Sequence, residues 1–131
     1  MSAERIERIR SSTFPGISDS VRVSAGDLLF VSGAVGFEED GSVPGDFARA
    51  VELTLRELQR ALNSGGAEFA DVVRINIYIT QLDDERLRVF REVRDRIMDV
   101  ENPPASSLIG VQSLVMGATV EIDAIAALPT H

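Results

Sequence analysis

The segment Thr119-Val120-Glu121-Ile122-Asp123-Ala124-Ile125-Ala126, near the C-terminus, carries the clearest structural pattern in the chain. Apolar residues alternate with others along it, and a period of two predicts a β-strand. Glu121 and Asp123 then share one face of the strand, and the other face is apolar: Val120, Ile122, Ala124 and Ala126. A strand this apolar is typically buried, so its two acids are expected either to line a pocket or to meet a partner chain.

A second segment, Asn102-Pro103-Pro104-Ala105-Ser106-Ser107, precedes it by one short strand and a turn. The prolines forbid continuation of a preceding helix. Small hydroxyls after prolines are typical of loops, so Ser106 and Ser107 are predicted to satisfy loop backbone groups. A nucleophilic serine needs an adjacent base, and the lone histidine is His131 at the chain end. Serine hydrolase chemistry is therefore excluded.

Length and composition predict one domain over residues 1–131, long enough to bury a core. The absence of cysteine excludes disulfides, thiolate catalysis and cysteine metal sites. A single histidine excludes a histidine-based triad or a multi-histidine metal centre within one chain. No metal is predicted, although a carboxylate-only site stays open; no loop has calcium-type spacing.

The formal net charge of −8 opposes binding to phosphate backbones. With no tryptophan and one tyrosine, the chain also offers no aromatic surface for stacking bases, so no nucleic-acid partner is expected. No apolar run approaches the roughly 20 residues of a membrane span. The first residues, Met1-Ser2-Ala3-Glu4-Arg5, lack the apolar segment of a signal peptide. The expected compartment is the cytoplasm, without a membrane partner.

Periodicity predicts six strands and two helices. The strands are 5–10 (for which a helical turn stays open), 21–23, 28–31, 71–80, 108–111 and 120–127. The continuously apolar residues 28–31 favour a central strand covered on both faces. The first helix begins after Asp46 as N-cap and ends at residues 63–66, with an apolar stripe of Phe47, Val51, Leu55, Leu58 and Leu62. The second begins at residues 83–84, with a stripe of Leu87, Phe90, Val93 or Arg94, and Ile97.

Two helices cover only one face of a sheet this size. The other face is predicted to be too apolar to remain exposed to solvent, and large exposed apolar patches usually mark interfaces. Self-association, most simply as a closed symmetric ring, is the expected solution.

Together the two C-terminal segments resemble the RidA/YjgF family of reactive-intermediate deaminases. That family usually has Pro-Ala-Arg-Ser where this chain has residues 104–107, and Val-Glu-Ile-Glu-Ala-Ile-Ala where it has residues 120–126. Residues 29–33 are similar to a family strand ending in Ser-Gly-Gln, and residues 66–73 to a Gly-x-x-x-x-Asp-Val-Val link. The resemblance runs from Phe14 onward. It implies an α+β, chorismate mutase-like protomer with one mixed six-stranded sheet and two helices on one face. It further implies a homotrimer with ligand pockets between subunits, and no cofactor.

The resemblance implies hydrolysis of an enamine or imine, with Glu121 positioning or activating the water. The ligand-binding positions it implies are Ser32, Gly33, Ser106, Ser107 and Arg91. The chain departs from the family pattern at several of these: Ala34 replaces a glutamine, Ser18-Asp19-Ser20 offers no tyrosine, Arg91 replaces an asparagine, and Ser106 replaces an arginine. A guanidinium binds a substrate carboxylate in bidentate fashion. Without it the pocket favours neutral or cationic ligands, unless another base such as Arg91 substitutes.

Several alternatives stay open. Glu121 is either a pocket acid or the partner of a neighbouring subunit's base, and Ser32 is either a pocket wall or a strand terminus. Asp123 is predicted to be structural, and Tyr78 to be an interface or core residue tethered by its hydroxyl. The chain is accordingly either a cofactor-free deaminase or a non-catalytic ligand-binding or regulatory trimer. A nuclease is a third, disfavoured reading, and the sequence does not specify a substrate.

Overall fold

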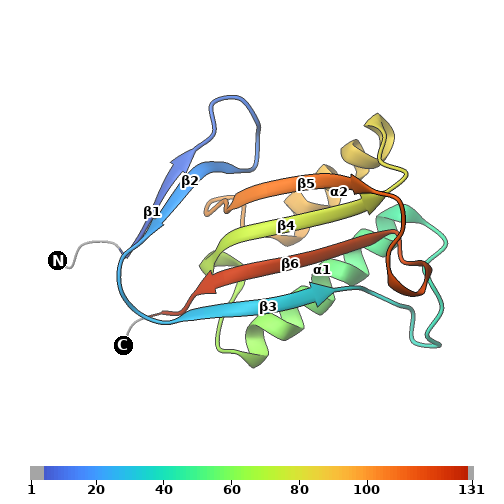
Figure 1. Cartoon of the computed structure of the whole chain (residues 1–131), viewed down its shortest axis with the longest axis horizontal. Helices are drawn as coiled ribbons and strands as arrows, with labels where there is room; N and C mark the ends of the chain where they lie inside the picture. The colour runs from blue at the N-terminus through green and yellow to red at the C-terminus, as the bar shows by residue number, and fades with distance from the viewer. Residues whose placement is uncertain (1–4, 130–131) are drawn as a thin grey trace.

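The protein is described by a computed structural model over residues 5–129. Its six-stranded sheet has the order β1-β2-β5-β4-β6-β3, and Figure 1 shows α1 and α2 together behind it. The elements are β1 Ile6–Arg10, β2 Ser18–Val23, β3 Leu28–Ala34, α1 Phe47–Ser64, β4 Val72–Thr80, α2 Asp84–Ile97, β5 Ala105–Val111 and β6 Val120–Ala127, with short 3₁₀ turns at Phe69–Asp71 and Val115–Gly117. The predicted α+β architecture, a mixed sheet with both helices on one face, is confirmed.

The sheet is mixed because β5 runs parallel to β4 and β2, whereas the other neighbouring strands are antiparallel. The strand predicted at residues 5–10 is present as the edge strand Ile6–Arg10 and not as a helical turn. The connection between β2 and β5 is a single pairing of Ser18 with Ala105. Arg8 strengthens this narrow junction by donating to the carbonyl oxygens of Val72, Pro103 and Ala70, at 3.0, 2.9 and 2.9 Å. The β1–β2 hairpin is thereby fixed beside β5.

The core lies between the helices and the sheet. The predicted stripe of α1 is confirmed, with Val51, Leu55, Leu58 and Leu62 fully buried against the isoleucines of β4. Both predicted helix starts are also confirmed. Asp46 accepts a hydrogen bond from the backbone N–H of Arg49 at 3.2 Å, and Asp83 from that of Arg86 at 2.7 Å. These caps satisfy backbone donors that the first helical turn leaves without partners.

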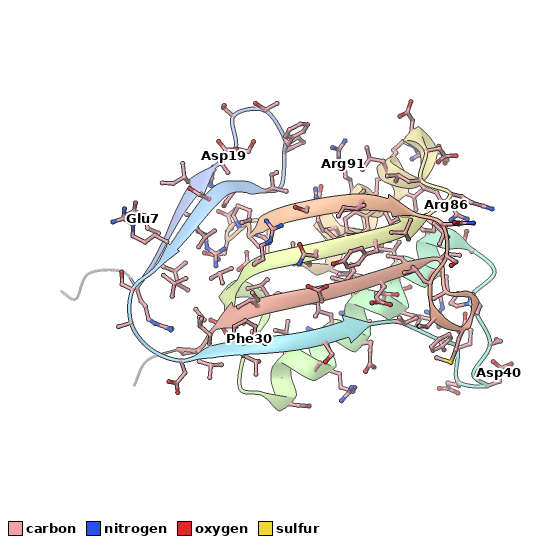
Figure 2. All side chains as sticks on the ribbon, viewed as in Figure 1. Glu7, Asp19, Phe30, Asp40, Arg86 and Arg91 are labelled. Atoms are coloured by element: carbon pink, nitrogen blue, oxygen red, sulfur yellow. The ribbon has the colours of Figure 1, made fainter. Side chains whose placement is uncertain are left out.

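The prediction that residues 28–31 form a central strand covered on both faces is wrong for the protomer. β3 pairs only with β6 and is the edge of the sheet. Leu29 and Val31 pack against the core, whereas Phe30 points the other way and is 70% exposed. Figure 2 shows Phe30 on this outermost strand, away from the helices.

Candidate functional site

The bare side of the sheet carries a row of polar side chains. Asn76 of β4 lies opposite Asp123 of β6, and Tyr78 lies opposite Glu121. Asp123 accepts hydrogen bonds from Asn76 Nδ2 at 2.9 Å and from the Tyr78 hydroxyl at 3.1 Å. The tether predicted for Tyr78 is therefore present, and Asp123 has the contacts of the structural residue it was predicted to be.

Tyr78 keeps its proton well into the alkaline range. Burial raises the pKa of its phenol above the usual value, and the hydrogen bond to Asp123 and the charge of Glu121 act in the same direction. All these causes disfavour a phenolate, which would add charge beside two carboxylates. Tyr78 is consequently a fixed hydrogen-bond donor in this row, and it is not a base.

Ser107 belongs to the same row. Arg74 donates to Ser107 Oγ at 2.6 Å and to Asn76 Oδ1 at 3.0 Å, which ties β5 to β4 through side chains. The prediction that Ser106 and Ser107 lie in a loop is wrong, because β5 begins at Ala105 directly after the prolines. Both serines are strand residues, and their side chains therefore point to opposite faces of the sheet.

Glu121 lies beside an irregularity in β3. Val31 pairs with Ala124 and Ala34 with Ile122, so Ser32 and Gly33 form a β-bulge. A β-carbon at position 33 would lie 2.9 Å from the carboxyl carbon of Glu121 and closer still to its Oε2, a separation that real β-carbons essentially never show. Only glycine lets the carboxylate rest on the backbone here. Bulges of this kind often re-aim strands next to functional sites.

No hydrogen bond to the Glu121 carboxylate is present within residues 5–129, although the residue is only partly exposed. Its neighbours across β4 direct their polar atoms at Asp123 instead. The bulge of Ser32 and Gly33 thus lies beside Glu121, an acid that retains its accepting capacity.

Ser106 points to the helix side of the sheet, because it pairs with the buried Ile75. There it lines a cavity of about 370 Å³ between the β1–β2 loop, α2 and β5. Arg91 lines the same cavity, and Figure 2 shows it on the part of α2 nearest the hairpin. Most of the remaining wall is apolar and includes Phe14, Leu87, Phe90 and Leu108.

The sheet therefore divides the predicted site residues into two groups. Glu121, Ser32, Gly33 and Ser107 belong to its bare face, whereas Ser106 and Arg91 belong to the helix side. Within a single copy the two groups face away from each other, so no ligand contacts both.

Sequence reasoning missed Arg94 as a functional candidate. It lines the same cavity as Ser106, and its side chain is only 12% exposed. The available signal was its position in α2, where the helical period calls for an apolar residue and the chain has an arginine.

Within residues 5–129, no three side chains of the histidine, cysteine, aspartate and glutamate types gather where they would hold a metal ion. No helix in that part of the chain is long and apolar enough to cross a membrane.

Comparison with known proteins gives concordant matches. The model of a family described as Endoribonuclease L-PSP matches residues 17–128. The RutC family protein YjgH of Escherichia coli is 33% identical over 110 residues, which cover 84% of this chain and 82% of the relative. A 2-iminobutanoate/2-iminopropanoate deaminase of Dermatophagoides farinae is 28% identical over 110 residues, covering 81% and 82%. The crystal structure of YyfB from Yersinia pestis, described as a Rid-family protein of unknown function, superimposes with a TM-score of 0.81 at 29% identity, covering 95% of this chain and 100% of that one.

Proposed function

Because the chain belongs to the RidA/YjgF family, we propose that it is a cofactor-free deaminase that hydrolyses imines or enamines at sites between the copies of a homotrimer. The observation that carries this proposal is the Glu121 carboxylate lying over Gly33 without a hydrogen-bond partner among residues 5–129. The name of the Dermatophagoides relative supports the reaction class.

The chemistry needs only water and one acid–base group. Starting from the protonated imine, Glu121 accepts a proton from a water molecule as that water's oxygen bonds to the imine carbon and the C=N π electrons move to nitrogen, which gives a neutral carbinolamine. The carboxyl group then returns this proton to nitrogen. As the C–N bond breaks and ammonia leaves, the Glu121 carboxylate takes the hydroxyl proton and the oxygen becomes a carbonyl. A carboxylate placed within hydrogen-bond reach of the water typically accelerates such proton transfers about 10²- to 10⁴-fold.

Two copies are needed because the candidate residues lie on opposite faces of the sheet. The bare face also carries exposed apolar side chains that a neighbour would cover: Phe30, Leu28 and Ile109 are 70%, 46% and 47% exposed. In the proposed trimer, the Glu121 face of one copy closes the cavity that contains Ser106 of the next copy. The ligand then contacts Ser32, Gly33 and Glu121 from one side, and Ser106 and Arg91 from the other.

The direct test is ammonia release from freshly generated imines, including imines without a carboxylate. Glu121→Ala and Glu121→Gln are expected to lower kcat at least about 100-fold. Glu57→Gln on the exposed surface of α1 is the control, because it removes only a surface ion pair with Arg60. Wild-type protein without turnover on any imine of the panel would refute the deaminase.

The shared site has its own test. Ser106→Trp fills the cavity, and Glu121→Ala removes the acid, so each variant alone is expected to be inactive. Co-expression gives mixed oligomers, in which some sites combine an intact cavity from one copy with an intact Glu121 from another. Recovered activity supports a site between copies. Mixed oligomers that stay inactive contradict it.

A specific substitution favours the second candidate, a non-catalytic ligand-binding or regulatory trimer. Ser106 and Ala34 stand where the family resemblance expects an arginine and a glutamine. In that case a ligand raises the thermal unfolding midpoint by mass action without being converted. Strong stabilisation by a ligand that the protein never turns over would favour this candidate over the enzyme.

A further inference from the structure

Arg94 places a guanidinium beside the space where the family resemblance expects a different arginine. Arg94 and Ser106 both line the cavity of about 370 Å³, and both also line a smaller cavity of about 20 Å³ against the β1–β2 loop. The Arg94 side chain is only 12% exposed. Charged side chains are rarely buried to this extent without partners.

Three contacts hold this guanidinium in place. Its Nε donates to Asp95 Oδ1 at 3.0 Å, and its Cζ lies 5.9 Å from the centroid of the Phe90 ring. The guanidinium also packs on Gly16, where a β-carbon would lie closest to NH2, 2.7 Å from Cζ and 3.3 Å from NH1. A group fixed from three directions loses little freedom when a ligand binds.

The outer edge of the guanidinium has no hydrogen-bond partner among residues 5–129. Within residues 5–129, the NH1 and NH2 groups of Arg94 donate no hydrogen bond, since its one bond uses Nε. Asp99, which lines the smaller cavity, is already engaged by Asn102 Nδ2 at 2.7 Å and by the backbone N–H of Glu101 at 2.9 Å. The remaining pair of terminal nitrogens is the edge that binds a carboxylate in bidentate fashion.

The rest of the cavity specifies the body of the ligand. Leu82, Leu87, Phe90 and Leu108 line it, and its volume lies in the range of small-molecule sites. Arg91 is placed differently from Arg94. It also lines a depression on the outer surface of α2, which places it at the rim.

We infer that Arg94 is the carboxylate anchor of this site, and that the ligand is a 2-imino acid with a branched or aromatic side chain. The reaction part of this inference rests on the proposed function, and hydrolysis would then yield the matching 2-oxo acid and ammonia. The anchoring part stands on the contacts of Arg94. Serine at position 106 leaves room for the larger side chain, and Arg94 supplies the charge from the neighbouring helix.

Binding of stable 2-oxo acids tests the anchor without any turnover. Calorimetric titration of the full chain compares phenylpyruvate, 4-methyl-2-oxopentanoate and pyruvate with benzylacetone, an uncharged aromatic ketone. We expect phenylpyruvate to bind at least about tenfold tighter than pyruvate, because the apolar wall is buried only by the larger ligand. Arg94→Gln should weaken the binding of phenylpyruvate about 10- to 100-fold and leave the binding of benzylacetone unchanged.

Matched variants keep the result specific. Arg96→Gln, an exposed arginine on the same helix, should change nothing. Arg91→Gln removes a ligand contact at the rim of the cavity and should weaken phenylpyruvate binding less than Arg94→Gln does. Arg94→Lys retains the charge without the planar fork and should fall between wild type and Arg94→Gln. Equal weakening of both ligands by Arg94→Gln, no weakening at all, or a larger loss in Arg91→Gln would overturn the anchor. Pyruvate binding as tightly as phenylpyruvate would overturn the side-chain preference.

Glu121→Ala separates this inference from the proposed function. Carboxylate binding through Arg94 is expected to persist in that variant. If it persists while wild-type protein hydrolyses no imine, the deaminase fails and the anchor stands. If imines are hydrolysed and Arg94→Gln leaves the KM of carboxylate-bearing imines unchanged, the deaminase stands and the anchor fails.

Discussion

Gly33→Ala should damage catalysis without damaging the fold. An added methyl group at position 33 would lie 2.9 Å from the carboxyl carbon of Glu121, whereas ordinary contacts of a β-carbon begin at 3.4 Å. The carboxyl carbon must therefore move by about 0.5 Å, the difference between these two distances, and Oε2 must move further. Misplacement of a reacting group by about 1 Å can lower a rate about 10²-fold, so we expect kcat to fall about 10- to 100-fold.

The stability of the variant should change little. The atom that must move is the end of a flexible side chain, and Gly33 does not have a positive φ. The control is Gly45→Ala, since nothing lies within 4 Å of a β-carbon there and Gly45 also lacks a positive φ. Both variants are compared by ammonia release and by thermal unfolding.

A double-mutant cycle gives the decisive comparison. In a Glu121→Ala background the carboxylate is gone, so the added methyl at position 33 should have almost no further effect on the residual rate. The reasoning is refuted if Gly33→Ala leaves kcat unchanged, or if it lowers the rate equally in both backgrounds.

Two further predictions concern the bare face of the sheet. Tyr78 is the sole tyrosine and the chain has no tryptophan, so tyrosinate absorbance reports this phenol alone. Its midpoint should lie above about 10, the usual value, and Asp123→Asn should lower it by removing a charged acceptor. Because the pKa of Tyr78 is raised in the folded state, its protonated phenol contributes to folding stability below about pH 10, and this contribution is lost as the pH rises through the raised pKa. A titration midpoint at or below about 10 contradicts the assignment. Phe30→Asp should dissociate the proposed trimer in sedimentation equilibrium while Val115→Asp, on the turn before β6, should not, and an unchanged mass for Phe30→Asp would show that the bare face is not the interface.

The sequence predicted the elements well and the environment of one strand badly. The alternation in β6 and the stripe of α1 follow directly from the periods of strand and helix, so both were predictable. Residues 28–31 were misplaced because a short apolar run looks the same in a central strand and in an edge strand with one apolar face exposed. The pattern records that both faces are apolar. It does not record whether the same chain or another copy covers them.

The site was harder to predict because proximity along the chain says little about which face a side chain takes. Ser106 and Ser107 are neighbours, yet strand geometry sends one to the helix side and the other to Arg74 on the bare face. Assigning both to a loop concealed this division. Arg94 was missed for another reason. It was one of two alternatives for a single position of the apolar stripe, and its placement in the cavity depends on packing against Gly16, which is far away in sequence.

The matched family model is described as an endoribonuclease, and the distribution of charge argues against that activity here. All 13 Lys and Arg positions are arginines, and several arginines on the helices form ion pairs with acidic side chains. Arg49 pairs with Glu38 and Glu52, and Arg88 pairs with Glu85 and Glu92. Tight binding of a phosphate backbone requires several clustered cations that release counterions together. One buried guanidinium with a free edge, beside an apolar cavity, instead suits a single small anion. The same net charge of −8 that repels RNA leaves such an enclosed site effective, because salt screens surface charges more than about 8–10 Å away, whereas a direct contact inside the cavity is screened much less.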